Sequence, residues 1–288
     1  MNFIFTEEQT AIRDMALSFA RVRMAPHAAA WEDAGTLPLD VLGELGGLGM
    51  GTMFISEADG GSAMSRLDGV LVFEALSHGC PAVAAFVSIH NMAAALIAAA
   101  GSPEQRRRWL PGLASMETLA SYCLTEPGAG SDAAAIATRA VRDGDDYVLN
   151  GTKQFISGAG LSGLYVTMAR TGGAGFSGIT AFAIEKDTPG LSFGPPERKM
   201  GWGAQPTCSV VFDDARVPAA NRLGVEGDGF RFAMRALDGG RINIAACSIG
   251  AASAACEKAL GYMGERRAFG APLSDLQALR FKIADMAT

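Results

Sequence analysis

The sequence predicts an α+β protein in which a helical domain, an antiparallel β-domain and a second helical segment follow one another. Three observations support this order. Apolar residues recur at helical spacing in the first part of the chain, period-two runs replace them from Leu119, and the helical period returns at Asp228. The expected domains are an N-terminal helical domain (1–117), a middle β-domain (118–222) and the start of a C-terminal helical domain (223–288).

Five helices are expected in the first domain. The sequences at 6–9 and 102–105 are capping boxes, and Ser65 is a further helix cap. The longest apolar tract, 81–100, is mostly alanine and carries polar residues such as His90. It is therefore predicted to be a buried core helix and not a membrane span.

Seven strands are expected in the β-domain, at 120–124, 137–141, 147–149, 154–156, 165–168, 181–184 and 209–212. Turn sequences separate them, and Asn150-Gly151 is predicted as the turn between the third strand and the fourth. Strands this close together, with no helices between them, indicate an antiparallel barrel or sandwich. A Rossmann fold is excluded because no GxGxxG motif lies between a strand and a helix.

The last segment is predicted to hold one long helix, from Asp228 to about Arg266, and a second helix that begins at a capping box at 274–277. The second helix stops at Thr288 in the middle of its apolar period. One long helix and part of another cannot bury their apolar faces alone. We therefore expect the sequence to be a fragment of a chain with a complete C-terminal helical bundle.

The composition argues against several classes of function. Apolar residues make up 49 % of the chain and charged residues 19 %, which predicts a sizeable core. The net charge of −6 is spread along the chain and argues against partners such as nucleic acid or an anionic membrane surface. The five cysteines have no metal-binding spacing, so we expect no metal site and buried thiols in a reducing compartment. The N-terminus has no signal or transit pattern, and we expect a cytoplasmic protein.

The stretch 121–132 is the first candidate site. It begins as a strand, breaks at Pro127, and passes through Gly128 and Gly130 to a Ser-Asp pair. Two glycines around a small residue allow backbone N–H groups to converge on one point, and Ser131 adds a hydroxyl donor. Such a loop suits an anionic or polar ligand, although the same residues also form ordinary surface turns.

A second candidate lies inside the long helix, at Asp238-Gly-Gly-Arg241. Two glycines in mid-helix cost about 1 kcal/mol each against alanine and therefore need a reason. They could clear a surface beside Asp238 and Arg241, which share a helix face and could grip a phosphate-bearing ligand. Equally, the charged residues could form an exposed ion pair and the glycines could serve helix packing.

A third candidate is the strand around Phe155. Phe155 and Ser157 are expected on one face of the strand and Ile156 on the other. An aromatic ring beside a hydroxyl could stack on and hydrogen-bond a planar heterocycle. A half-buried strand with a satisfied serine is the plainer alternative.

Together these stretches resemble the acyl-CoA dehydrogenase family along essentially the whole chain. The resemblance rests on YCLTEPGAGSD at 122–132, NGTKQFISGA at 150–159, LDGGR at 237–241, ERRAFG at 265–270, and Gln277 with FKIADMA at 281–287. The sequence GGRINIA, together with FIS, is most similar to the isobutyryl-CoA dehydrogenase branch. The resemblance implies FAD as the cofactor and a fold of helical, β and helical domains.

The resemblance also implies roles for individual residues. Flavin-binding roles fall on Tyr122, Leu124, Thr125, Gly130, Ser131, Phe155, Ile156 and Ser157, with Phe155 against the flavin ring and Ser157 near its nitrogen N5. Substrate-binding roles fall on Ser131, Asp238, Gly239, Gly240 and Arg241, at the CoA end of the substrate. Arg266, Phe269 and Gln277 would reach the FAD of a neighbouring subunit, which implies a homo-oligomer, a tetramer or a dimer.

The implied reaction is α,β-dehydrogenation of a short or branched acyl-CoA, with electrons passed to an electron-transferring flavoprotein. The family's base is usually a glutamate in the C-terminal helical domain, which we expect beyond Thr288, and its alternative position is occupied here by Gly240. We therefore expect these 288 residues alone to be inactive. Two alternatives remain: a flavin-dependent monooxygenase or oxidase on the same scaffold, and a non-catalytic flavin- or CoA-binding protein.

Overall fold

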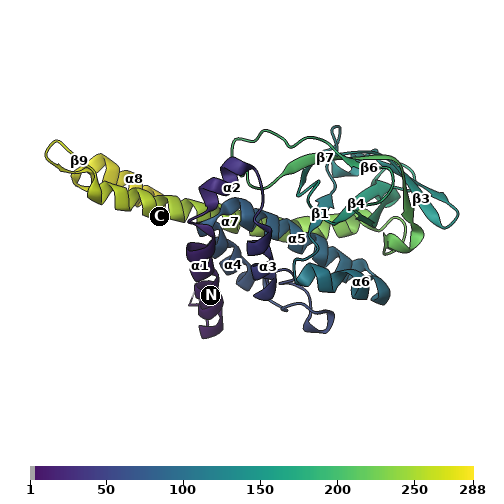
Figure 1. The fold of residues 1–288 in the computed structure, drawn as a ribbon, viewed down its shortest axis with the longest axis horizontal. Coiled ribbons are helices and arrows are strands. Elements are labelled where there is room, and N and C mark those ends of the chain that lie inside the picture. Colours follow the sequence, from purple (N-terminus) through teal and green to yellow (C-terminus); the bar gives the residue numbers. More distant parts are fainter. Residues whose placement is uncertain (1–3) are drawn as a thin grey trace.

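The computed structural model describes residues 4–288, and its elements follow the predicted order of helices, strands and helices. Figure 1 shows the β-sheet at one end of the molecule and the α8 end of the chain at the other, with the long helix α7 running between them. The first helices pack around the middle of α7.

Six α-helices precede the sheet in the described part of the chain: α1 (Glu7–Phe19), α2 (Ala28–Ala34), α3 (Leu39–Gly47), α4 (Arg66–Gly79), α5 (Pro81–Ala100) and α6 (Pro103–Ala114). The two capping boxes predicted in this domain form, since Thr6 Oγ1 accepts the N–H of Gln9 at 3.1 Å and Ser102 Oγ accepts that of Gln105 at 3.2 Å. Helix α2 was not predicted because it is short and none of its residues is fully buried, so it carries no clear apolar period.

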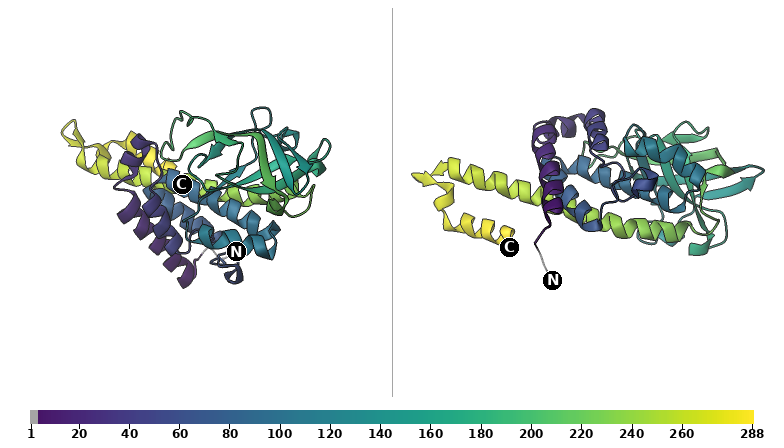
Figure 2. Two further views of the ribbon diagram at one scale, coloured as in Figure 1. Left: turned by 45° about the vertical axis from the view of Figure 1, so that its right-hand side comes forward. Right: turned by 90° about the horizontal axis from the view of Figure 1, so that it is seen from below.

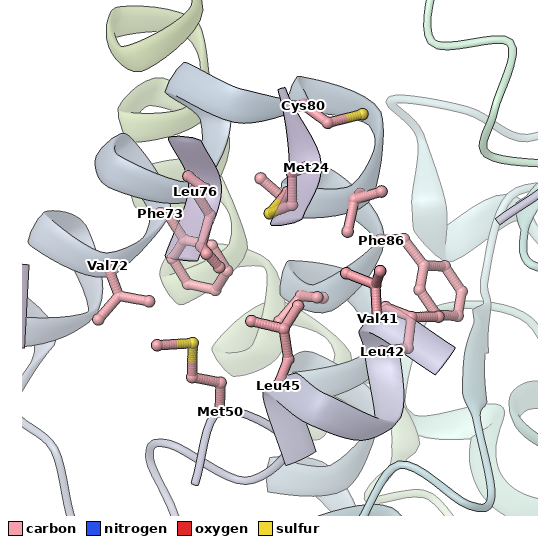
Figure 3. Close-up of a cluster of buried hydrophobic side chains, with 14 of the residues drawn as sticks. Met24, Val41, Leu42, Leu45, Met50, Val72, Phe73, Leu76, Cys80 and Phe86 are labelled. Atoms are coloured by element: carbon pink, nitrogen blue, oxygen red, sulfur yellow. The ribbon is translucent and has the colours of Figure 1, made fainter. Parts of the chain in front are cut away.

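The helical domain has its own core (Figure 3). Side chains from α3 and α4 meet there, and Leu45, Phe73 and Leu76 are fully buried. Helix α5 is long and apolar enough to cross a membrane by length and composition, but 78 % of its most apolar window is buried inside the protein. The prediction of a buried core helix is confirmed.

The sheet contains β1 (Ala120–Cys123), β2 (Arg139–Asp143), β3 (Asp146–Ser157), β4 (Leu164–Arg170), β5 (Ile179–Glu185), β6 (Leu191–Phe193), β7 (Thr207–Pro218) and β8 (Arg222–Leu223). Its strand order is β6-β7-β3-β2-β4-β5-β8, and most pairs are antiparallel, as predicted. Strand β1 joins β4 in parallel, with Ala120 opposite Leu164. A cluster of apolar side chains from α5, α7, β1 and β4 joins the helices to the sheet.

The prediction of a turn at Asn150-Gly151 is wrong. Strand β3 runs through both residues and pairs with β2 on one side and β7 on the other. Gly151 has φ of +149°, the register with β7 shifts beside it, and a Cβ there would lie 2.5 Å from Thr138 Oγ1. The glycine therefore serves a bulge in a continuous strand, a role that an Asn-Gly pair shares with turns.

Helix α7 (Gly229–Glu265) spans 37 residues, which corresponds to about 55 Å at 1.5 Å per residue. A short hairpin, β9 (Arg267–Ala268) and β10 (Ala271–Pro272), leads into α8 (Gln277–Ala287), which folds back along α7 (Figure 2). The predicted capping box at 274–277 is wrong: residues 273–275 form a 3₁₀ turn, and α8 begins after Leu276 without a side-chain cap.

Candidate functional site

A cavity of 480 Å³ lies where the loop after β1, the end of β3 and the helices α5 and α7 meet. Its wall contains nine of the predicted site residues: Tyr122, Leu124, Thr125, Gly130, Ser131, Phe155, Ile156, Ser157 and Arg241. Three stretches that are far apart in the sequence therefore converge on one space.

A buried ion pair holds the loop that forms one wall. Lys153 Nζ lies 2.7 Å from Glu126 Oε1 and also donates to the carbonyl of Leu124 at 3.1 Å. Glu126 accepts in addition the main-chain N–H groups of Ala137 and Thr138, at 2.6 and 3.0 Å. The carboxylate thus ties the beginning of the loop to its end, and the segment 127–136 projects between the two fixed points.

Burial and pairing act in opposite directions on the pKa values of both side chains. Burial would raise the pKa of Glu126, but the ammonium group of Lys153 and the N–H donors hold it below the ordinary value. Burial lowers the pKa of Lys153, against the opposing effect of Glu126. The Lys153 side chain is fully buried and that of Glu126 is 6 % exposed, so neither charge has water as an alternative partner.

Two residues of the cavity wall, Gly130 and Ser131, have main-chain donors that the described part of the protein leaves free. In residues 4–288, no protein group accepts a hydrogen bond from the main-chain N–H of Gly130 or Ser131. Asp132 is the one carboxylate in the wall among the described residues. Backbone N–H groups that face a cavity without a partner suit an anionic or polar ligand, as the sequence predicts.

Phe155 and Ser157 form the part of the wall that β3 contributes. Phe155 has φ of +58° and its side chain is 62 % exposed, whereas Ile156 is packed in the sheet core with 2 % exposure. The register between β3 and β7 shifts between Lys153 and Ile156. The left-handed conformation of Phe155 costs free energy. It interrupts the regular strand and turns a large aromatic ring outward.

Arg241 supplies a positive charge from α7. Phe230, Met234 and Leu237 precede it at helical spacing in the same wall. Among residues 4–288, no carboxylate lies within 4.0 Å of its guanidinium, so the predicted alternative of an Asp238–Arg241 ion pair does not form. An unpaired arginine at a cavity is suited to a phosphate or carboxylate ligand.

The structure separates Asp238, Gly239 and Gly240 from this wall. A Cβ at Gly239 would lie 2.7 Å from the guanidinium of Arg66, and one at Gly240 would lie 2.9 Å from Met92 Sδ. At Gly239 a protein side chain therefore fills the space, which favours the helix-packing alternative there, whereas the substrate-binding role of Gly240 stays a prediction. Gly240 lines a second cavity of 260 Å³, and Met92 lies in the walls of both cavities.

Arg266, Phe269 and Gln277 lie at the opposite end of α7 from the sheet (Figure 1). Phe269 is 96 % exposed. These residues cannot contact the cavity of their own chain, so their predicted role depends on a second subunit.

Sequence reasoning missed several residues of the wall. Ile89 and Met92 come from α5, which was predicted to have only a structural role, and Asp132 was noted without a function. The Glu126–Lys153 pair was also missed. The sequence around Lys153 carries no clear signal for it, because the lysine lies between the polar residues Thr152 and Gln154 and Glu126 lies in a distant loop.

The comparisons with known proteins identify the family of the chain. The family models for the N-terminal, middle and C-terminal domains of acyl-CoA dehydrogenases match residues 6–117, 121–215 and 227–288. Isobutyryl-CoA dehydrogenase, mitochondrial, of Bos taurus is 51 % identical over 282 residues, which are 98 % of this chain and 68 % of the bovine protein.

Solved structures are also similar. A chain in the structure described as the electron transferring flavoprotein of Acidaminococcus fermentans has a TM-score of 0.96 at 39 % identity, covering all of this chain and 76 % of the other. A structure of PigA with FAD and proline has a TM-score of 0.94 at 28 % identity, with the same coverage.

Fold and cavity together define a flavoprotein of three successive domains. The chain belongs to the acyl-CoA dehydrogenase family, with isobutyryl-CoA dehydrogenases among its relatives at 51 % identity. FAD is the cofactor of this family, and the cavity suits it. An exposed aromatic ring, a serine hydroxyl and unpartnered main-chain donors match the flat ring and the anionic groups of a flavin nucleotide.

Proposed function

We propose that this protein takes part in the FAD-dependent α,β-dehydrogenation of a short or branched acyl-CoA, with an electron-transferring flavoprotein as acceptor. The observation that carries the proposal is the convergence of Phe155, Ser157, Ser131 and Arg241 on one cavity. The name of the bovine relative supports isobutyryl-CoA as the substrate to test first.

Different residues of the chain would bind the cofactor and the substrate. Main-chain groups of Tyr122, Leu124 and Thr125 would hold the cofactor, with Phe155 against its ring and Ser157 at its edge. When bound, FAD supplies the acceptor for the hydride that leaves the β-carbon. Arg241 and Ser131 would bind the anionic CoA portion, and the apolar side chains of α5 and α7 would exclude water from the acyl group.

The catalytic base stays unassigned. Gly240 has no side chain to supply it, and Glu126 is already paired with Lys153. We therefore expect the described residues to bind an acyl-CoA without removing its α-proton. Asp132 is the residue to substitute first if proton removal does occur, because its carboxylate is in the wall.

The assembly is also a proposal. Apolar side chains on α7 and α8 are exposed in the single chain, including Ile249, Leu260, Tyr262, Phe281 and Met286. They lie on the elements that also carry Arg266, Phe269 and Gln277. Exposed apolar side chains of this number favour a homo-oligomer in which this end meets another subunit. A cytoplasmic location likewise stays a prediction, since the bovine relative is named as mitochondrial.

Arg241→Met tests the substrate half of the proposal. The variant should bind FAD as the parent does and should bind CoA thioesters at least tenfold more weakly, because it loses an unpaired cation at the cavity. Calorimetric titration with isobutyryl-CoA measures both chains. The matched control is Arg231→Met, an arginine of the same helix that pairs with Asp228 and lies outside the wall. Equal losses in the two variants would contradict the proposed role of Arg241.

A further inference from the structure

Ser157 receives a hydrogen bond from outside the cavity. Gln205 Nε2 lies 2.5 Å from Ser157 Oγ, and the Gln205 side chain is not part of the cavity wall. Gln205 is 5 % exposed. It therefore lies behind the serine, on the side away from the space that would hold the flavin.

The position of Gln205 is strongly fixed. Ser157 pairs with Thr207 at the end of the β3–β7 ladder, and Gly158 donates to the carbonyl of Pro206 at 2.7 Å. Lys199 Nζ binds the carbonyls of Trp202 and Gln205 and the hydroxyl of Thr207. The main chain on both sides of the glutamine is thus held before any ligand binds.

This arrangement determines where the serine proton can go. A hydroxyl has one hydrogen to donate and accepts through its lone pairs. Because the amide N–H of Gln205 occupies an acceptor position, the proton of Ser157 is left to point elsewhere. Within residues 4–288 no protein atom accepts it, and the serine faces the cavity.

We propose that Gln205 is a positioning residue that makes Ser157 a hydrogen-bond donor to the edge of the flavin ring. The inference rests on the proposed function, because it needs a flavin in the cavity. It adds Gln205, a residue of the loop before β7 at which no sequence motif indicates a site. Among the described residues Gln205 Oε1 has no hydrogen-bond partner, so Ser157 is the group that the amide binds.

Two substitutions and their combination test the inference. The readouts are the FAD dissociation constant and the flavin midpoint potential of the loaded chain. Ser157→Ala should shift the potential by about 30 mV, the equivalent of a tenfold change in a two-electron equilibrium. Gln205→Leu should shift it in the same direction, since the serine proton is then free to turn away. The double variant should shift it no further than Ser157→Ala alone.

Gln154→Leu is the matched control. Gln154 lies on the same strand and binds Glu197 at 2.6 Å, but it is not in the cavity wall. Gln154→Leu should leave the midpoint potential of the flavin unchanged. If Gln205→Leu acted only by weakening the fold, it too should leave the potential of the loaded chain unchanged.

The outcomes separate the two claims. A parent chain that binds no FAD overturns the proposed function, and this inference with it. A chain that binds FAD but keeps its potential in Gln205→Leu overturns the inference alone. A shift from Gln205→Leu that persists undiminished in the Ser157→Ala background also overturns it, because the glutamine would then act by another route.

Discussion

At the scale of single residues, three sets of polar side chains fix the geometry around the cavity: the Glu126–Lys153 pair, Ser157 with Gln205, and His90. His90 is fully buried on α5, where its Nε2 binds the carbonyl of Leu113 at 2.9 Å. Its Nδ1 accepts the N–H of Ala120 at 3.1 Å, at the start of β1. Since Nδ1 accepts, the ring is neutral, and it joins α5 and α6 to the strand that leads into the site.

His90 predicts a specific pH dependence of stability. Burial lowers its pKa to about 4 from the ordinary value of 6.5. The unfolded chain therefore takes up a proton as the pH falls through 6.5 while the folded chain does not, and stability is lost between pH 6.5 and 4. From pH 7.5 to pH 5 the loss from this group should be about 2 kcal/mol, measured as the free energy of unfolding in urea. In His90→Gln this component of the slope should be absent, whereas His78→Gln, a partly exposed histidine beside Glu257, should retain it.

Lys153→Met tests the buried ion pair. The substitution leaves the Glu126 carboxylate without its cation, and we expect a loss of about 3–5 kcal/mol in the free energy of unfolding. FAD binding should weaken as well, because the segment 127–136 loses one of its anchors. Arg216→Met, which breaks an exposed pair with Asp143, is the control and should leave stability essentially unchanged. The two variants behaving alike would show that the pair does not hold the loop.

At the scale of elements, the two glycines of α7 show how a helix adapts to its neighbours. The guanidinium of Arg66 lies 4.0 Å from the centre of the Phe54 ring and against Gly239, so the arginine is held between an aromatic ring and a helix backbone. Only a glycine at position 239 leaves enough space beside α7 for the Arg66 guanidinium.

Gly239→Ala should therefore behave differently from an ordinary glycine replacement. Alanine favours a helix over glycine by about 1 kcal/mol, and Gly261→Ala on the same helix should show that gain because nothing lies within 4 Å of the new Cβ. At position 239 the gain should be cancelled by displacement of Arg66, and it should reappear in an Arg66→Ala background. Urea unfolding of the four variants measures the coupling, and identical gains at 239 and 261 in the parent background would refute the packing account.

Most of the elements could be predicted from the sequence because apolar periods and capping residues are local signals. Thr6 and Ser102 are caps in the structure, and the alanine-rich helix α5 is buried as expected. The Asn150-Gly151 pair misled because the same residues suit a turn and a bulge, and only pairing with β7 decides between them. The division of the chain into domains at residues 117 and 222 stays a prediction.

The site was predictable in part for the same reason. Residue type alone indicates the loop 121–132 and the pair Phe155 and Ser157, and the structure brings them together. Gln205 and Met92 do not, because their positions depend on tertiary contacts between distant segments. A glycine inside a helix, such as Gly239, indicates that something lies close to the backbone. The sequence does not show that this neighbour is Arg66, because Arg66 belongs to another helix.

At the scale of the whole molecule, the sheet domain and the α8 end lie far apart along α7 (Figure 1). The cavity is formed near one end, and exposed apolar side chains of α7 and α8 extend toward the other. The two ends can cooperate only if a second subunit places its α8 end near the cavity of the first.

Self-association is therefore expected, and sedimentation equilibrium measures it. The parent chain should sediment as a dimer or a larger species, and Phe281→Glu on α8 should weaken the association at least tenfold by placing a charge in the apolar contact. Val141→Glu is the control, since Val141 is 54 % exposed on the sheet at the other end of the molecule. A parent chain that stays monomeric at high concentration would contradict the assembly.

The most direct measurement is the visible spectrum of the purified chain with FAD, before and after anaerobic addition of isobutyryl-CoA. We expect a bound flavin whose spectrum differs from that of free FAD, is perturbed by the thioester, and stays oxidised because no catalytic base is assigned among the described residues. A spectrum identical to that of free FAD would contradict the flavin site, and bleaching by the thioester would contradict the account of the missing base and point to Asp132.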